Sequence, residues 1–525
     1  MDISKLTLEQ KVGQLFLLTF EGTDLSEESK AHFRKYCIGN FIYFARNLTD
    51  YKSIRALSDK LQELTMETSG IPAFISADQE GGMVMRAYSG TTHFPYNMAL
   101  TASGATPATA EQVGQMVGES LRSLGVNVNH APVADVNNNP KNPVIGARSY
   151  SGDKDVVSAM VSAYAQGLQS SGVMANVKHF PGHGDTDVDS HLALPSIEHD
   201  MARLEEIELA PFRAAFAAGV DSVMSAHILF KAIDSELPAT LSHKIMTGLL
   251  REKMNFDGLI ITDCMSMDAI RKNFSMEKAC VMAINAGVDL ICLCAGAEVQ
   301  TPCVEAVLEA ARSGEIPMER LDSAVGRILK YKQKYASSKD APAPQQFHEA
   351  HEALADEISQ KSLTLLKADD SLLPLAGKVK SDELFVISTV RSRASLVDDT
   401  VIKFDTFAEL AAKALDAEHA IIATKLDEAE AAETALKAAP YPVVLLAVSN
   451  VMQNPGQVSL FKALKAAGKK VVVVALGAPY DVLLMQDADV YIAAYEYTNR
   501  SVKSVIKALK GEAEFSGTLP GGVEV

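Results

Sequence analysis

Short runs of apolar residues alternate with longer segments of helical periodicity along the first 335 residues. The longer segments repeat their apolar positions every three to four residues, as amphipathic helices do. Parallel strands that are buried on both faces read as short, nearly continuous apolar runs. Eight runs fit that description: QLFLLTF, GNFIYFA, PAFISAD, NVNHAPVAD, MANVKHF, DSVMSAH, GLIITD and VDLICLC. Eight strand–helix units in a chain segment of this length predict an α/β fold of the (β/α)8 TIM-like barrel type.

The pattern changes at residues 336–346, where two prolines prevent the preceding helix from continuing. We expect a linker there, between a catalytic barrel domain at 1–335 and a second domain at 347–525. Five further apolar runs in the second domain predict an open α/β unit with a parallel sheet: ELFVIS, AIIAT, YPVVLLAVS, VVVVALG and VYIAAY. The ends of these runs carry no acid/base pair and no glycine-rich phosphate loop, which favours a structural or interface role.

The net charge of −17 limits the partners that the chain is expected to bind. Nucleic acids and anionic membrane surfaces are bound mainly through clustered Lys and Arg, so neither is an expected partner. The opening segment lacks the basic and apolar parts of an export signal, and no later run approaches the length of a membrane span. These features predict a cytoplasmic protein.

Six cysteines are too few and too unevenly spaced for a disulfide framework in a chain of 525 residues. We expect reduced thiols, as is usual in the cytosol. Cys292 and Cys294 fall on one face of the last barrel run. Because no second Cys pair lies nearby, a place in the buried core is favoured over zinc binding.

Polar and charged residues follow several of the predicted barrel strands. At or just beyond the C-terminal ends of the apolar runs lie Asp78, Asp135, Lys178–His179, His227 and Asp263. Barrel enzymes of this type hold their active sites at the face where these strand ends meet. We therefore expect these side chains to surround one site.

The densest group of such residues is the segment KHFPGHGDTDVDSH, which begins at Lys178 and leaves the fifth strand as a polar loop. One hypothesis is a zinc or iron site, with ligands His179, His183, His227 and Asp263. It is disfavoured because Lys178 would place a positive charge beside the metal and the first strand offers no His-x-His pair. Phosphate transfer is disfavoured because the loop carries mostly carboxylates instead of a basic cradle.

Nucleophilic and acid/base catalysis fit Asp263 and the pair Asp189 and His191. Hydrolysis at an acetal carbon needs a carboxylate nucleophile on one face of the sugar and a proton donor on the other. Asp263 would point from a rigid strand into the barrel mouth, the alternative being that it caps the helix that follows. Asp189 would fix the tautomer of the His191 imidazole and favour its protonated form. His191 could then donate a proton to the leaving oxygen and later accept one from water.

Three segments of the chain carry a resemblance to a known family: ADQEGG, NNNPKNPVIGARSYS and KHFPGHGDTDVDSH. Together they closely resemble the β-N-acetylglucosaminidases of glycoside hydrolase family 3, of the NagZ type, over about the first 335 residues. The second domain looks like the αβα sandwich domain of the two-domain members. The resemblance implies that Asp263 forms a covalent glycosyl-enzyme and that Asp189 and His191 are the acid/base dyad.

The resemblance also implies that the chain needs no metal and no cofactor, and that five residues hold the N-acetylglucosamine ring: Asp78, Arg86, Arg148, Lys178 and His179. Their chemistry suits that role, since carboxylates and arginines bind vicinal hydroxyls and Lys adds a charge-assisted hydrogen bond. The chain departs from the family at Met83, where an Arg is common after DQEGG. This departure puts the local pairing of Asp78 in doubt.

The sequence therefore predicts a retaining exo-β-N-acetylglucosaminidase that removes the non-reducing N-acetylglucosamine from peptidoglycan-derived muropeptides. A carbohydrate is the expected partner, and the oligomeric state is left open. The main alternative is a phosphorylase of the same family, since an imidazole donor lacks the permanent negative charge that would repel phosphate. A metal-dependent barrel hydrolase and a sugar-binding protein without turnover are less favoured.

Overall fold

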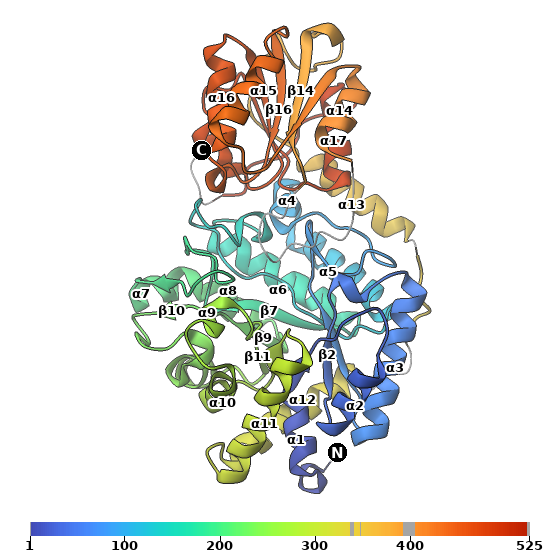
Figure 1. The fold of residues 1–525 in the computed structure, drawn as a ribbon, viewed down its shortest axis with the longest axis vertical. Coiled ribbons are helices and arrows are strands. Elements are labelled where there is room, and N and C mark those ends of the chain that lie inside the picture. Colours follow the sequence, from blue (N-terminus) through green and yellow to red (C-terminus); the bar gives the residue numbers. More distant parts are fainter. Residues whose placement is uncertain (1, 337–340, 347, 392–404, 522–525) are drawn as a thin grey trace.

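The computed structural model describes residues 2–336, 341–346, 348–391 and 405–521 (Figure 1). Residues 337–340, which belong to the predicted linker, lie outside the described residues. On either side of the predicted linker at 336–346, helix α12 (Met318–Tyr335) ends and helix α13 (Glu349–Lys361) begins.

The first domain is a barrel of eight parallel strands surrounded by helices (Figure 1). The strand order is β11-β9-β7-β6-β3-β2-β1-β12, and a bridge between Ile261 and Leu290 links the two ends of the sheet. The strands are β1 (Phe16–Leu18), β2 (Asn40–Ile42), β3 (Phe74–Ala77), β6 (Val128–Asn129), β7 (Met174–Phe180), β9 (Ser222–Ser225), β11 (Leu259–Thr262) and β12 (Ile291–Leu293). Each of the eight apolar runs contains one of these strands, which confirms the predicted barrel.

Helices of the barrel domain bury one apolar stripe each. Helix α3 begins after Asp50, whose carboxylate accepts two backbone N–H groups, and ends at Gly70 in the left-handed region at φ 68°. Its buried residues recur every three or four positions, as a helix packed on a sheet requires. The main helices besides α12 are α1 (Leu8–Gln14), α2 (Glu27–Lys35), α3 (Tyr51–Ser69), α5 (Pro107–Ser123), α6 (Lys154–Ser170), α8 (Ala210–Ala217), α10 (Met276–Ala286) and α11 (Ala297–Ser313).

The second domain is a six-stranded sheet with helices on both faces, in the order β13-β18-β17-β16-β14-β15. Its strands are β13 (Thr364–Lys367), β14 (Leu384–Thr389), β15 (Glu418–Ile422), β16 (Val443–Val448), β17 (Lys470–Ala475) and β18 (Val490–Ala493). Separate apolar clusters lie under α14 (Phe407–Leu415) and α17 (Asn499–Leu509) on one face, and under α15 (Glu428–Lys437) and α16 (Gly456–Ala466) on the other. This is the predicted αβα sandwich.

The five strands expected from the apolar runs pair in parallel, as predicted, and a sixth strand that was not expected lies at one edge. Strand β13 pairs antiparallel with β18, while the other described pairs of this sheet are parallel. The segment TLLK that forms β13 is short and becomes steadily more exposed along its length, so it lacks the continuous apolar signal of a central strand.

The two domains pack together through one apolar cluster that both contribute to. Tyr96 and helix α4 (Asn97–Ala102) of the barrel domain meet Tyr480, Ala493 and Tyr495 of the second domain. Hydrogen bonds cross the same interface. The backbone N–H of Tyr96 donates to the Glu496 carboxylate at 2.9 Å, and Thr518 N–H donates to the Ala102 carbonyl at 3.0 Å.

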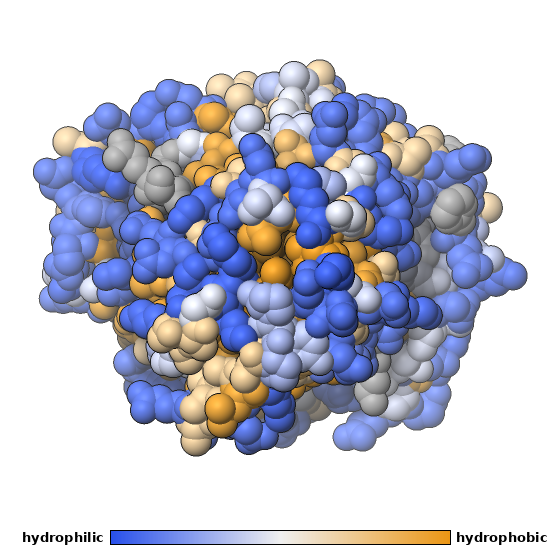
Figure 2. Space-filling view, turned by 90° about the horizontal axis from the view of Figure 1, so that it is seen from above, coloured by the Kyte–Doolittle hydropathy of each residue, from blue (hydrophilic) through white to orange (hydrophobic). Residues whose placement is uncertain are grey.

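The surface of the second domain, seen from above in Figure 2, is mostly hydrophilic with smaller apolar areas. Among the described large apolar side chains, Leu436 is the most exposed at 73%. Within the described ranges, no helix combines the length and apolar character needed to cross a bilayer.

Candidate active site

A cavity of about 590 Å³ opens at the C-terminal ends of the barrel strands. Its described lining residues all lie between Ile42 and Val299, so the wall belongs to the barrel domain. Seven of the eight site residues expected from the sequence line it: Asp78, Arg86, Arg148, Lys178, His179, His191 and Asp263. The eighth, Asp189, is hydrogen-bonded to His191. The structure therefore brings the whole expected set together.

Asp263 follows the last residue of β11, and its backbone N–H extends the strand pairing to the Ser225 carbonyl at 3.1 Å. Its carboxylate accepts the N–H of Cys264 at 2.7 Å. The next helix, α9 (Asp268–Arg271), has Met267 at its N-cap. Asp263 therefore does not cap that helix, and its side chain lines the cavity from a rigid strand end.

The charge of Asp263 is set by the imidazoles around it. Burial acts to raise the pKa of its carboxyl, but His179, His227 and His191 outweigh burial and hold that pKa below its ordinary value. The group is consequently an anion at neutral pH, as a nucleophile must be.

His191 is held by Asp189 from the same loop. The imidazole Nδ1 lies 2.8 Å from the Asp189 Oδ1, which also accepts the backbone N–H of His191 at 2.8 Å. Burial acts to lower the pKa of His191, whereas the hydrogen bond to Asp189 and the charge of Asp263 raise it, with a net upward shift. These contacts favour the protonated form of the ring, and its Nε2 is left for the cavity.

A lattice of buried ion pairs forms another part of the wall. Lys178 Nζ lies 2.7 Å from the Asp78 carboxylate and 2.6 Å from that of Glu80. Arg148 binds Glu80 through two nitrogens at 2.8 Å each, and Arg86 reaches Asp78 at 3.4 Å. Charged groups this deeply buried are stable only when each has partners. We call these five residues the charge lattice.

The charge lattice keeps both carboxylates ionised. Burial alone would raise their pKa values, but Lys178 and Arg86 lower the pKa of Asp78 well below its usual range. Arg148 and Lys178 likewise overcome burial and lower the pKa of Glu80 to about 2. Lys178 in turn has a raised pKa, because Asp78 and Glu80 outweigh its own burial. The lattice presents fixed charges to a ligand.

Glu80 was not among the residues expected from the sequence, although it stands in the ADQEGG motif. Its side chain is fully buried, and both of its cationic partners come from distant segments of the chain. The available signal was a glutamate shortly after a buried strand and between Gln79 and Gly81, since buried carboxylates are rare unless paired.

The two glycines of that motif lie where the chain turns back: Gly81 ends strand β4 (Gln79–Gly81), and Gly82 begins the turn that leads to β5 (Val84–Met85). Gly81 and Gly82 have φ of 116° and 55°, and a Cβ on Gly82 would stand 2.3 Å from the ring of Tyr96. Met83 lies against the second domain as part of the apolar interface cluster. The pairing of Asp78 therefore proceeds through the charge lattice, and an Arg at position 83 is not needed for it.

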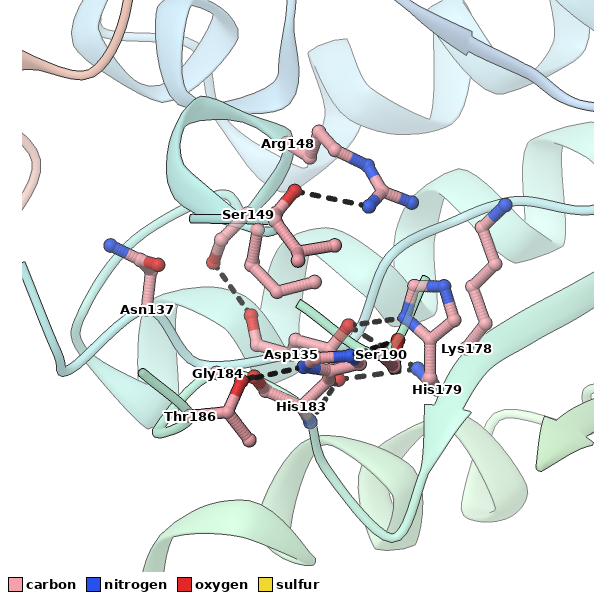
Figure 3. Close-up of polar contacts among 12 residues, drawn as sticks. Asp135, Asn137, Arg148, Ser149, Lys178, His179, His183, Gly184, Thr186 and Ser190 are labelled. Carbon is pink, nitrogen blue, oxygen red and sulfur yellow. Dashed lines mark hydrogen bonds and ion pairs between the residues drawn. The ribbon is translucent and has the colours of Figure 1, made fainter. Parts of the chain in front are cut away.

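His179 is oriented by Asp135 (Figure 3). Its Nδ1 lies 2.6 Å from Asp135 Oδ2, and the same carboxylate accepts the backbone N–H of His183 at 2.7 Å. The His179 Nδ1 therefore donates, and the Nε2 is the ring nitrogen left for a ligand. Asp135, which the sequence placed at a strand end without a role, positions this ring.

The four residues of the metal hypothesis are engaged otherwise. His183 bonds Thr186 and Ser190 at 2.9 Å each, and His227 bonds Thr240 at 2.8 Å and the Cys264 carbonyl at 3.1 Å. Burial lowers the pKa of His183 to about 4. In the part of the chain that the structure describes, no three His, Cys, Asp or Glu side chains are arranged to hold a metal ion.

Three cysteines also line the cavity, namely Cys264, Cys292 and Cys294. The expectation that Cys292 and Cys294 belong to the core holds for Cys292, which is buried, and is wrong for Cys294, which is partly exposed. Cys294 comes one residue after β12 ends, so its side chain is at the mouth of the barrel and not between the sheet and the helices.

Comparison with known proteins identifies the family. The model of the glycosyl hydrolase family 3 N-terminal domain matches residues 7–331, and that of the family 3 C-terminal domain matches residues 267–524. The chain belongs to glycoside hydrolase family 3. This glycosidase family and its two-domain architecture are those expected from the sequence motifs.

Individual relatives agree with that assignment. The family 3 chain is 33% identical to β-hexosaminidase A of Pseudoalteromonas piscicida over 411 residues, covering 70% of this chain and 69% of the relative. A solved family 3 β-N-acetylglucosaminidase from Paenibacillus sp. str. FPU-7 is 37% identical, with a TM-score of 0.90 and 98% of both chains covered. A β-glucoside phosphorylase shares the fold at 23% identity and a TM-score of 0.83, covering 99% of this chain and 94% of its own.

The charge lattice yields a first prediction. Glu80→Gln keeps the side-chain volume but removes the anion shared by Arg148 and Lys178, so we expect the free energy of unfolding to fall by about 3 kcal/mol or more. Chemical denaturation of the variant and the parent measures this change. Glu198→Gln is the control, because Glu198 pairs with Lys231 on an exposed surface. Equal stability losses in the two variants would contradict the structural role of Glu80.

Proposed function

We propose that this family 3 glycosidase is a retaining exo-β-N-acetylglucosaminidase. The observation that carries the proposal is that the Asp263 carboxylate and the Asp189-bound imidazole of His191 line one cavity. A carboxylate nucleophile and a separate proton donor are the equipment that a double displacement at an anomeric carbon requires. The names of the relatives, β-hexosaminidase and β-N-acetylglucosaminidase, support the choice of sugar.

In the first step, Asp263 attacks the anomeric carbon while His191 donates its proton to the leaving oxygen. This gives a covalent glycosyl-enzyme and a free alcohol. In the second step, His191 accepts a proton from water, the water attacks the anomeric carbon, and the Asp263 carboxylate leaves. The sugar keeps its anomeric configuration because two displacements occur.

Electrostatics suit His191 to both of its roles. The negative charge of Asp263 is one of the influences that raise the pKa of the imidazole in the free enzyme. Ester formation at Asp263 removes that charge, so the proton affinity of His191 falls just when the ring has to deliver its proton and then act as a base. Asp189 holds the ring of His191 in place in the free enzyme.

The charge lattice and His179 supply the groups that would bind the sugar ring. Asp78 and Arg86 suit vicinal hydroxyls, Arg148 suits the acetamido carbonyl, and Lys178 and the Nε2 of His179 suit further hydroxyls. Fixed, paired charges of this kind are pre-organised, so little free energy is lost in ordering them around the substrate. A muropeptide fragment with a non-reducing N-acetylglucosamine is the substrate that we propose.

The proposal also covers the organisation of the chain. Residues 1–335 form the catalytic domain, 336–346 the linker and 347–525 a domain of structural role, which is supported by a cavity wall drawn from residues 42–299. Free cysteines, three of them in the cavity wall, are compatible with a reducing compartment and support a cytoplasmic role in peptidoglycan recycling.

Phosphorolysis is the second candidate. Two groups in the cavity wall favour it. The imidazole of His191 carries no permanent negative charge that would repel phosphate, and the guanidinium of Arg271 would attract it. Product analysis with and without inorganic phosphate separates the two reactions, since hydrolysis yields the free sugar and phosphorolysis yields the sugar 1-phosphate.

Removal of the nucleophile tests the core of the proposal. Asp263→Ala should lower kcat on an aryl N-acetyl-β-glucosaminide by roughly a thousandfold or more, because no glycosyl-enzyme can form. Asp257→Ala is a matched control at the opposite, exposed end of the same strand. Near-normal turnover by Asp263→Ala would exclude a covalent mechanism through this residue.

The proton donor is tested with leaving groups of different quality. His191→Ala should lose on the order of a thousandfold in kcat/KM on a poor leaving group and much less on dinitrophenolate, which departs without a proton. Steady-state kinetics and burst amplitudes measure the difference. His199→Ala, from the same loop region and paired with Asp185, serves as the control. Equal losses on both substrates would argue against His191 as the acid.

The partner of His191 predicts a change in the pH profile. Asp189→Asn removes a carboxylate that raises the pKa of His191, so that pKa should fall. The protonated donor is lost as pH rises through its pKa, and the alkaline fall in kcat/KM should therefore begin at a lower pH in the variant. Asp187→Asn, in the same loop, should leave the profile in place. An unchanged alkaline limb in Asp189→Asn would contradict the dyad.

A further inference from the structure

Three sulfur atoms lie together beside the nucleophile. Cys264 directly follows Asp263, Cys292 belongs to β12, and Cys294 comes just after that strand. The Sγ atoms of Cys292 and Cys294 are 3.5 Å apart, and the N–H of Cys294 donates to the Sγ of Cys264 at 3.3 Å. All three line the catalytic cavity. We call these three residues the thiol cluster; the catalytic roles above make no use of it.

The environment distinguishes Cys264 from the other two members. Its Sγ is stabilised by the thiols of Cys292 and Cys294 and by the hydroxyl of Ser266, 3.0 Å away, and these contacts hold its pKa well below the ordinary value. The same contact with Cys264, together with burial, raises the pKa values of Cys292 and Cys294. One thiolate beside neutral thiols is the arrangement that peroxide-reactive cysteines have.

Access and geometry favour reaction at two of the sulfurs. Cys264 and Cys294 are partly exposed, whereas Cys292 is buried. Cys264 and Cys294 follow the ends of the neighbouring strands β11 and β12, and the Sγ of Cys264 already lies 3.3 Å from the backbone nitrogen of Cys294. Cys292 and Cys294 are separated by one residue in an extended segment, which places their Cα atoms near the upper limit for a bridge.

We propose that the thiol cluster is a peroxide-sensitive modification site, in which a disulfide between Cys264 and Cys294 switches off the catalytic cavity. The Cys264 thiolate attacks hydrogen peroxide, which breaks the O–O bond and gives a sulfenic acid and hydroxide. The Cys294 thiol then attacks that sulfur and releases water. Two thiols lose two electrons and two protons, and one peroxide becomes two waters.

The disulfide would act on the nucleophile through the backbone. The Cys264 N–H donates to the Asp263 carboxylate at 2.7 Å, so a bridge that draws Cys264 toward β12 moves the group that orients Asp263. A misplacement of about 1 Å at a reacting group costs on the order of a hundredfold in rate. A reductant that cleaves the bridge restores the original position.

The test treats the full-length chain with hydrogen peroxide, removes the peroxide with catalase, and divides the sample. One part is alkylated and mapped by mass spectrometry for a peptide pair joined through Cys264 and Cys294. The other is assayed on an aryl N-acetyl-β-glucosaminide before and after dithiothreitol. We expect the cross-link, a loss of activity of at least about tenfold, and recovery on reduction.

Variants locate the effect. Cys264→Ser and Cys264→Ala should each keep their own starting activity after peroxide, and Cys294→Ser should accumulate a sulfenic acid at Cys264 that dimedone labels. Cys37→Ser is the control, because Cys37 is partly exposed and lies outside the cavity wall; it should form the cross-link as the parent does.

Three results would overturn the proposal: no cross-link in the parent chain, a cross-link without loss of activity, or equal inactivation of the Cys264 variants. The activity arm rests on the proposed function, whereas the cross-link does not. If the untreated chain cleaves no glycoside, the proposed function fails, and mapping of the cross-link alone decides the modification site.

Discussion

Two carboxylates and three cations are buried at the mouth of the barrel, and the site depends on the ion pairs between them. Glu80 is fully buried, and it holds Arg148 and Lys178 at distances of 2.6 to 2.8 Å. Asp78 shares Lys178 and adds Arg86. Burying any one of these charges without its partners would cost several kcal/mol of desolvation free energy. The segments that supply the five residues therefore have to pack together in one arrangement. The requirement that stabilises the lattice also fixes the positions of the four members that line the cavity: Asp78, Arg86, Arg148 and Lys178.

Much of this arrangement was predictable because barrel topology converts position along the chain into position in space. A residue that follows an apolar run lies at the C-terminal end of a strand, and this rule predicts that Asp78, Lys178, His179 and Asp263 meet at one face of the barrel. The Asp189–His191 pair was predictable for a different reason, since an Asp side chain can bond to a residue two positions later; the segment forms a turn at 190–192, not the extended loop that was expected.

Other features depend on contacts between distant segments, which periodicity does not encode. Glu80 and Arg148 are 68 positions apart, and no local pattern pairs them. Cys294 was expected in the core because the run that contains it is apolar, but the strand ends one residue earlier. Strand β13 was missed because an exposed edge strand needs no continuous apolar run. In each case the environment of the residue depends on the tertiary structure, which the local sequence pattern does not encode.

The segment Gly81–Gly82 lies between Glu80 of the charge lattice and the interface with the second domain. It follows Glu80 directly and packs on Tyr96, whose backbone is bonded to Glu496 of the second domain. The second domain therefore supports the β4–β5 hairpin that carries Glu80, and Glu80 in turn holds Arg148 and Lys178. A barrel without this support would keep all the residues of the cavity wall but would hold Glu80, and through it Arg148 and Lys178, less rigidly.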